Sequence, residues 1–230
     1  MLILPYKWVH FLCFLWLGII PPSVLTAQEL QLHFTPASEN HDAPLVFFLS
    51  GDGGWVHFCQ PFSDKMAELK MPVIGLDSRK YFWNHVQPEK AAQDLAPVMR
   101  EYLQKWNRKS ILFVGFSFGA DVVPFIYSYL PTDLREKIKL VVLMSPAKTT
   151  DFQVHYIDMM GMGPDNYAND VVKAMDAIRK VPVLCIYGDE EKPIFPPDFI
   201  HPNIKVETVN GSHHYKDGDG VSQLIIDAMR

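Results

Sequence analysis

The chain alternates short apolar runs with segments of helical periodicity, and this alternation constrains its fold more than any other feature. Runs rich in branched residues have the length of buried strands, at 45–50, 72–78, 110–117, 140–145, 181–188 and 204–211. Helix-like patterns separate or follow them, at 61–69, 89–106, 118–130, 169–179 and 221–229. Strands joined through helices form a mostly parallel sheet that is covered on both faces. The sequence therefore predicts an α/β protein, with 30–34 as an additional edge strand.

The first residues have the order of a secretory signal peptide. Lys7 precedes an apolar run at 8–20, and two prolines at 21–22 end this run. The run is shorter than the roughly 20 apolar residues that span a bilayer as a helix. We expect cleavage of a signal peptide at 1–27 and export of a single domain at 28–230. An uncleaved N-terminal anchor is the alternative.

Charge and cysteine content exclude several classes of protein. Without Lys7, 20 basic and 26 acidic side chains give a formal charge of −6, which offers no broad attraction for nucleic acid. Only Cys59 and Cys185 follow the predicted signal peptide, too few for a disulfide-rich scaffold. Their spacing does not decide whether they pair. No second His or Cys cluster completes the His and Asp residues at 213–219, so we expect no metal and no cofactor.

The pattern GFSFG at 115–119 follows an apolar strand and opens a helix. In that context G-x-S-x-G is typical of a nucleophile elbow, in which a strained turn exposes the serine hydroxyl and the glycines allow close backbone contact. The pattern alone is weak, and its place between strand and helix makes it specific. The sequence predicts Ser117 as a nucleophile on an α/β-hydrolase fold.

A serine needs a base, and in this fold the chain order is serine, acid, histidine. The acidic cluster 189–191 and the pair His213-His214 each follow a predicted strand. We predict His214 as the base because an aromatic residue follows it, with His213 as the alternative. The spacing from the strand end favours Glu191 as the acid, with Asp189 as the alternative.

The oxyanion of an acyl transfer also needs hydrogen-bond donors. The backbone N–H of Phe118, directly after the predicted nucleophile, is one candidate. The other should come from the loop GDGGW at 51–55, where we nominate Asp52 with Gly53 as the alternative. This loop lacks the Lys-Ser/Thr ending of a phosphate-binding P-loop.

Five segments together resemble the AcvB/VirJ family of bacterial virulence proteins, which are periplasmic α/β hydrolases. These segments are LSGDGGW, DSRKYFW, GFSFGADVVPF, CIYGDEE and GSHHY, in this order along the chain. The resemblance implies a periplasmic enzyme that hydrolyses aminoacylated phosphatidylglycerol at the membrane surface. It also implies, in some bacteria, a link to type IV secretion and its proteins.

The segment DSRKYFW holds candidates for binding such a lipid. Arg79 and Lys80 follow a strand end and could hold a phosphate, while Tyr81 and Trp83 could face acyl or glycerol carbons. Packing is the rival explanation for the aromatic residues. A general esterase or thioesterase for small substrates, and a non-catalytic scaffold, are the alternative functions.

The segment 147–167 breaks the alternation of strands and helices. It carries the Met-rich run IDMMGMG where only a short loop is expected. A small lid and an ordinary long surface connection are both compatible with this sequence.

Overall fold

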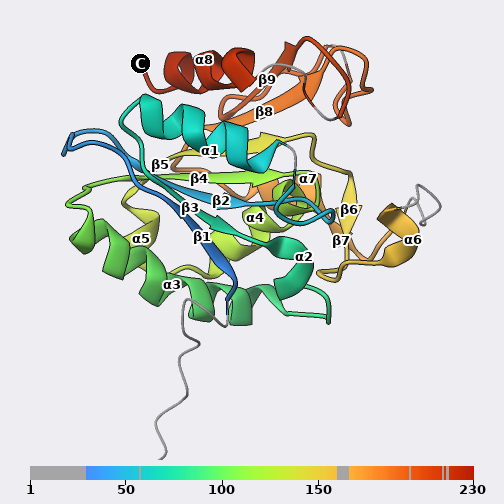
Figure 1. Cartoon of the computed structure of the whole chain (residues 1–230). Coiled ribbons are helices and arrows are strands. Elements are labelled where there is room, and N and C mark those ends of the chain that lie inside the picture. Colours follow the sequence, from blue (N-terminus) through green and yellow to red (C-terminus); the bar gives the residue numbers. More distant parts are fainter. Residues whose placement is uncertain (1–29, 57, 160–165, 197, 214, 216–217) are drawn as a thin grey trace, which may run out of the picture.

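The central feature of the computed structural model is a seven-stranded sheet with the order β1-β3-β2-β4-β5-β8-β9 (Figure 1). The structure describes residues 30–230 except 57, 160–165, 197, 214 and 216–217, so the predicted signal peptide lies outside it. The strands are β1 (Leu32–Thr35), β2 (Leu45–Leu49), β3 (Val73–Leu76), β4 (Ile111–Phe116), β5 (Ile138–Met144), β8 (Val183–Gly188) and β9 (Ile204–Val209). Among these seven strands, β1 is antiparallel to its neighbour β3, and all the other neighbours are parallel. The predicted strands and the edge strand are thereby confirmed.

Helices cover both faces of this sheet (Figure 1). One face carries α1 (Cys59–Glu68) and α8 (Gly218–Ala228), and the other carries α3 (Pro88–Lys105), α4 (Phe118–Tyr129) and α7 (Val171–Asp176). These five correspond to the predicted helices. Three short helices were not predicted, α2 (Ser78–Tyr81), α5 (Thr132–Arg135) and α6 (Tyr156–Met159). One helical turn is too short to show a 3.6-residue period in sequence.

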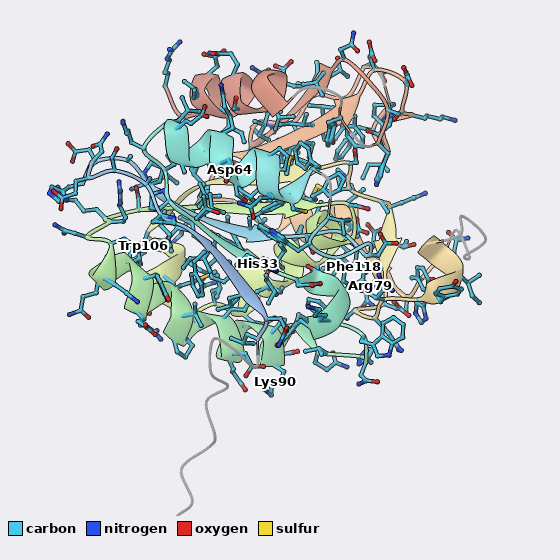
Figure 2. All side chains as sticks on the ribbon, viewed as in Figure 1. His33, Asp64, Arg79, Lys90, Trp106 and Phe118 are labelled. Carbon is cyan, nitrogen blue, oxygen red and sulfur yellow. The ribbon has the colours of Figure 1, made fainter. Side chains whose placement is uncertain are left out.

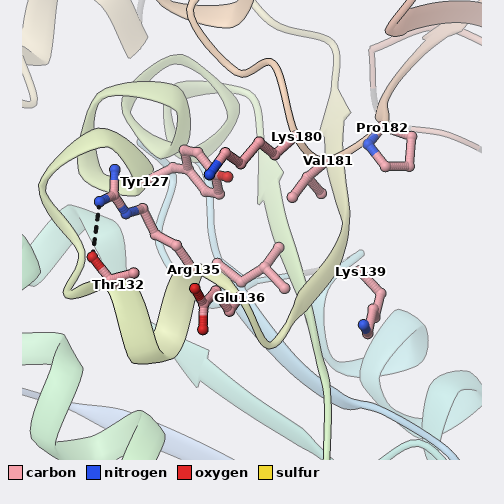
Figure 3. A pocket seen from close by; sticks show the side chains of 9 residues that line it. Tyr127, Thr132, Arg135, Glu136, Lys139, Lys180, Val181 and Pro182 are labelled. Atoms are coloured by element: carbon pink, nitrogen blue, oxygen red, sulfur yellow. Dashed lines mark hydrogen bonds between the residues drawn. The ribbon is translucent and has the colours of Figure 1, made fainter.

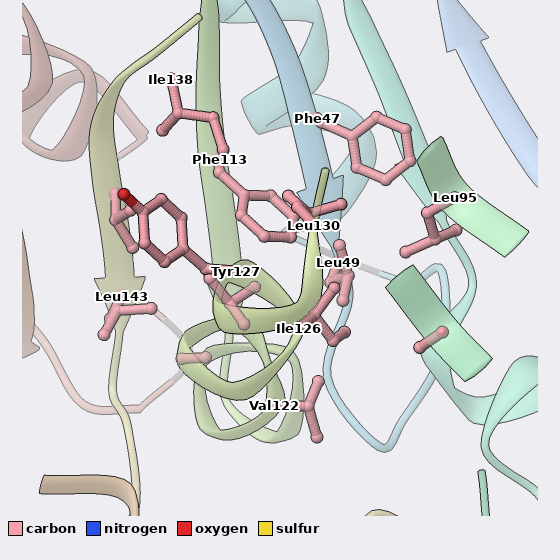
Figure 4. Packing of buried hydrophobic residues seen from close by; sticks show 14 of the residues in the cluster. Phe47, Leu49, Leu95, Phe113, Val122, Ile126, Tyr127, Leu130, Ile138 and Leu143 are labelled. Atoms are coloured by element: carbon pink, nitrogen blue, oxygen red, sulfur yellow. The ribbon is translucent and has the colours of Figure 1, made fainter. Parts of the chain in front are cut away.

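The central strands are buried on both faces, which explains their unbroken apolar sequence. Every residue of β2, β4 and β8 is buried. Phe47 and Phe113 point to the face of α3 and α4, where Ile126 joins them in the larger core cluster (Figure 4). Phe48 points to the opposite face and contacts Phe62 of α1, with 5.0 Å between ring centroids. The sheet therefore separates two apolar layers that hold its strand ends in fixed positions.

The described part of segment 147–167 is anchored to the rest of the domain. A two-stranded antiparallel ribbon joins β6 (Thr149–Thr150) to β7 (Asn169–Asp170). Phe152 and Val154 are buried, and the N–H of Val154 donates to the carbonyl of Phe82 at 2.8 Å. The Met-rich stretch at 160–165 lies outside the described residues.

Both remaining cysteines are buried and free, so Cys59 and Cys185 do not pair. The thiol of Cys185 lies 3.7 Å from the Met175 sulfur, and that of Cys59 lies beside the carbonyl of Gly54. Packing holds the domain together without a disulfide between them. Within the described ranges, no helix combines the length and the apolar character needed to cross a membrane.

Candidate active site

Ser117 occupies a strained turn between β4 and α4. Its φ of 52° and ψ of −123° lie outside the regions that L-residues ordinarily populate. A Cβ atom at Gly115 would lie 2.4 Å from the carbonyl oxygen of Gly119, and one at Gly119 would lie 2.3 Å from that of Leu49. Both glycines of the GFSFG pattern are therefore required by close backbone contacts.

The hydroxyl of Ser117 begins a chain of hydrogen bonds that joins three strand ends. Ser117 Oγ lies 2.9 Å from Nε2 of His213, and Nδ1 of the same ring lies 2.9 Å from Oε1 of Glu191. With Nδ1–H donated to the carboxylate, Nε2 is free to accept the serine proton. The structure thus brings together serine, histidine and acid after β4, β9 and β8.

The histidine in this series of hydrogen bonds is His213, which the sequence offers as the alternative base. His213 makes both hydrogen bonds, whereas His214, our preference from the sequence, lies outside the described residues. The hydrogen bond from the N–H of Tyr215 to the carbonyl of Ser212 closes a turn around His213. The ring of His213 also lies against Phe116 of β4, with 5.4 Å between centroids. These contacts hold the imidazole of His213 toward Ser117.

The carboxylate of Glu191 is held by several donors. Burial alone would raise the pKa of Glu191, but hydrogen bonds from His213, the hydroxyl of Ser145 and the N–H of Gly188 outweigh it and lower that pKa. The group is consequently an anion at neutral pH, as the partner of an imidazole must be. Asp189, the alternative acid, instead accepts a hydrogen bond from the N–H of Gly211 and fixes the loop.

Ser145 was not found by sequence analysis. It ends the apolar run at 140–145, directly beyond β5, and β5 lies between β4 and β8 in the sheet. Polar residues at the carboxyl ends of adjacent parallel strands converge, and this rule could have drawn attention to it.

The glycine-rich loop after β2 borders the nucleophile. A Cβ atom at Gly51 would lie 3.1 Å from the Cβ of Ser117, and the N–H of Gly54 donates to the carbonyl of Gly51 across a tight turn. Asp52 and Gly53 are the central residues of that turn. Together with Ser117 and His213, this loop lines a cavity of about 90 Å³.

A larger cavity of about 470 Å³ lies at the opposite end of the sheet (Figure 3). Its lining includes Ile138, which begins β5, and Pro182, which precedes β8, whereas Ser117 follows the carboxyl end of β4. The side chains around it include Tyr127, Arg135 and Glu136, with no serine or histidine. The cavity at Ser117 is smaller, but it holds the serine and the histidine that acyl transfer needs.

The predicted lipid-binding residues lie on or just after α2, with Arg79 on the same side of the molecule as Phe118 (Figure 2). The stem of Arg79 packs beside Gly54 of the loop, and its guanidinium contacts no acceptor among the described residues. Lys80 instead pairs with Asp77 at 3.5 Å.

The two aromatic candidates differ in their surroundings. The hydroxyl of Tyr81 donates to Asp94 on α3 at 2.8 Å, which is a packing role. Trp83 is half exposed, and its carbonyl accepts a hydrogen bond from Gln153. Of these four candidates, Arg79 is the one whose charged group contacts no acceptor among the described residues and whose stem lies beside the glycine-rich loop.

Asp121 is a buried carboxyl group in the first turn of α4. Its Oδ1 accepts a hydrogen bond from the N–H of Ala147 at 2.6 Å. Burial raises the pKa of Asp121 to about 8, the hydrogen bond from Ala147 opposes this rise, and the nearby Asp52 adds to it. The group is largely protonated at neutral pH, so it is a neutral hydrogen-bonding group rather than an anionic partner of the helix.

This raised pKa predicts an unusual pH dependence of stability. The unfolded carboxyl ionises near pH 3.8 and the folded one near pH 8, so between these values only the folded state holds the proton. The free energy of unfolding should therefore fall as pH rises through that window, by a few kcal/mol. Asp121→Asn keeps the acceptor for Ala147 and should remove this decline. Urea denaturation of both proteins from pH 4 to 8 measures it, and parallel curves would contradict the assignment.

No group of three or more His, Cys, Asp or Glu side chains in the described part of the chain is arranged to hold a metal ion.

Several solved structures resemble the chain. It resembles Est1E from Butyrivibrio proteoclasticus, with 16% identity over 86% of this chain and 93% of that one, and a TM-score of 0.56. It resembles the esterase Pf2001 from Pyrococcus furiosus, with 17% identity over 89% and 92% of the two chains and a TM-score of 0.58. The type II thioesterase BorB from the borrelidin biosynthetic cluster matches at 15% identity over 86% and 97%, with a TM-score of 0.54.

These likenesses show the α/β-hydrolase fold. No curated protein sequence matches the chain. The family model described as bacterial virulence protein (VirJ) matches residues 43–230, which is most of the chain and includes every residue of the site. The chain therefore belongs to the VirJ family of bacterial virulence proteins.

Proposed function

We propose that this protein is a serine ester hydrolase. The observation that carries the proposal is the continuous chain of hydrogen bonds from Ser117 through His213 to Glu191. A serine hydroxyl is a weak nucleophile until a base removes its proton, and His213 is within hydrogen-bond distance to do so. Glu191 would stabilise the imidazolium that forms.

The reaction proceeds in two halves. Ser117 Oγ attacks the ester carbonyl while His213 takes the hydroxyl proton, and collapse of the tetrahedral intermediate expels the alcohol, which receives that proton. Water then attacks the acyl-enzyme, with His213 as the base, and releases the acid and the free serine. The N–H groups of Phe118 and of Asp52, or its neighbour Gly53, would stabilise the oxyanion in both halves.

The favoured substrate is the aminoacyl ester of an aminoacylated phosphatidylglycerol, cleaved in the periplasm. The resemblance to the AcvB/VirJ family implies this substrate, and the family model that matches residues 43–230 supports the resemblance. The cavity at Ser117 is about 90 Å³, far smaller than the roughly 300–1,000 Å³ of sites for drug-sized ligands. It suits a small acyl group such as an amino acid better than a fatty acyl chain. The guanidinium of Arg79, which contacts no acceptor among the described residues, is suited to a lipid phosphate.

Vesicles that contain lysyl-phosphatidylglycerol test this substrate directly. The protein should release free lysine from them, and Arg79→Gln should slow the release by about tenfold, because it removes a charge-assisted hydrogen bond worth roughly 1.5 kcal/mol. The same variant should leave hydrolysis of p-nitrophenyl acetate unchanged. Arg100→Gln, which removes an arginine paired with Asp133 on the surface, is the matched control and should alter neither activity.

The outcome of this experiment separates the alternatives. Cleavage of p-nitrophenyl acetate without lysine release would favour a general esterase or thioesterase. A protein that cleaves neither would favour a scaffold that assists type IV secretion, and virulence would then survive Ser117→Ala.

A further inference from the structure

The carboxylate of Glu191 contacts a buried pair of hydroxyl groups that the reaction scheme does not use. Ser145 Oγ lies 2.6 Å from Oε2 of Glu191 and 2.6 Å from the phenol oxygen of Tyr215. The phenol also donates to the carbonyl of Ile186 at 2.9 Å. We propose that Ser145 and Tyr215 are positioning residues that fix the acid of the triad, an inference that rests on the proposed hydrolase function.

The count of protons gives the direction of these hydrogen bonds. Glu191 is ionised, so Ser145 must donate its single proton to Oε2. The contact between Ser145 and Tyr215 then requires the phenol to donate, with its proton shared between Ser145 and Ile186. The result is a directed chain from Tyr215 through Ser145 to the carboxylate.

The same tyrosine also fixes the base. The N–H of Tyr215 closes the turn that contains His213, and its ring packs against Phe58 and Phe116 at 5.3 and 5.8 Å between centroids. Tyr215 and Ser145 are both about 95% buried. Tyr215 therefore links the turn of the base to β8 and, through Ser145, to the acid.

Backbone conformation supports a functional rather than a merely structural role. Ser145 has a φ of 50° and Tyr215 a φ of 33°, and with Ser117 they are three of the seven described non-glycine residues in the left-handed region. Such conformations are costly and cluster where a site requires them. A glycine would satisfy the backbone of Ser145 better than serine does, but it would lack the hydroxyl.

Ser145→Gly is consequently the sharpest test, because it removes the hydroxyl and relieves the strained backbone. We expect kcat for p-nitrophenyl acetate to fall by about tenfold to a hundredfold with KM unchanged, since a hydrogen bond to a charged group is lost. The melting temperature should stay the same or rise. Tyr215→Phe, which keeps the ring, should lower kcat by a smaller factor. Tyr127→Phe, at the distant cavity, is the matched control and should leave kcat unchanged.

The possible failures are distinguishable. If the parent protein is active and Ser145→Gly retains its kcat, the positioning role is overturned and the proposed hydrolase function stands. If kcat falls only in proportion to a loss of folded protein, the role is structural and the inference is again overturned. If the parent neither hydrolyses the ester nor reacts with a fluorophosphonate, the proposed function fails and the inference fails with it.

Discussion

Replacement of His213 by Gln should lower ester hydrolysis by about four to six orders of magnitude. The loss is large because the residues of a triad act as a unit, and removal of the base leaves only substrate binding and oxyanion stabilisation. Gln preserves much of the volume of the ring, and His213 is partly exposed, so the fold should persist. The rate of p-nitrophenyl acetate hydrolysis by the purified variant, compared with the parent, measures the effect.

His214→Gln is the matched control for this variant, since it changes the adjacent residue in the same way. Its activity should remain within a few-fold of the parent, because His213 makes both hydrogen bonds expected of the base. If His214→Gln abolished activity and His213→Gln did not, His214 would be the base.

Gly119→Ala should destabilise the protein by at least about 3 kcal/mol, which is at the severe end for single substitutions. The added methyl would lie 2.3 Å from the carbonyl oxygen of Leu49 and 2.6 Å from that of Ser50. These atoms belong to the backbone at the end of β2 and cannot rotate away as a flexible side chain could. The midpoint of chemical denaturation measures the loss, and poor recovery of folded protein would agree with it.

Gly220→Ala is the control for glycine replacement. Gly220 lies in α8, where an added methyl would meet, among the described residues, the side chain of Val209 at 3.5 Å. Alanine has a higher helix propensity than glycine by about 1 kcal/mol, so this variant should be as stable as the parent or more so. If the Gly119 and Gly220 variants were equally stable, the steric clash that we expect at Gly119 would be contradicted.

The sheet could be predicted from the sequence because its strands are buried on both faces. Short continuous apolar runs such as LVFFL of β2 are typical of strands buried on both faces, and glycine or polar residues mark their ends. The short helix α2 and the ribbon of β6 and β7 could not be predicted in this way. Tertiary contacts such as the hydrogen bond between Val154 and Phe82 define them, and a local pattern does not record such contacts.

The residues of the candidate site also differ in whether a local sequence pattern marks them. Ser117 was predictable because its strained turn imposes glycines at fixed positions on both sides, as the short contacts of Gly115 and Gly119 show. The pair His213-His214 offers no such constraint in sequence, because the hydrogen bonds of His213 to Ser117 and Glu191 are contacts between distant parts of the chain. Ser145 carries no motif, and its importance follows from the order of β4, β5 and β8 in the sheet.

Reaction with a fluorophosphonate, followed by mass spectrometry of the labelled peptide, shows whether Ser117 is the nucleophile. We expect a single adduct on Ser117 in the parent protein and none in a folded Ser117→Ala variant. A parent protein that stays unlabelled, or an adduct on a different residue, would contradict this role of Ser117.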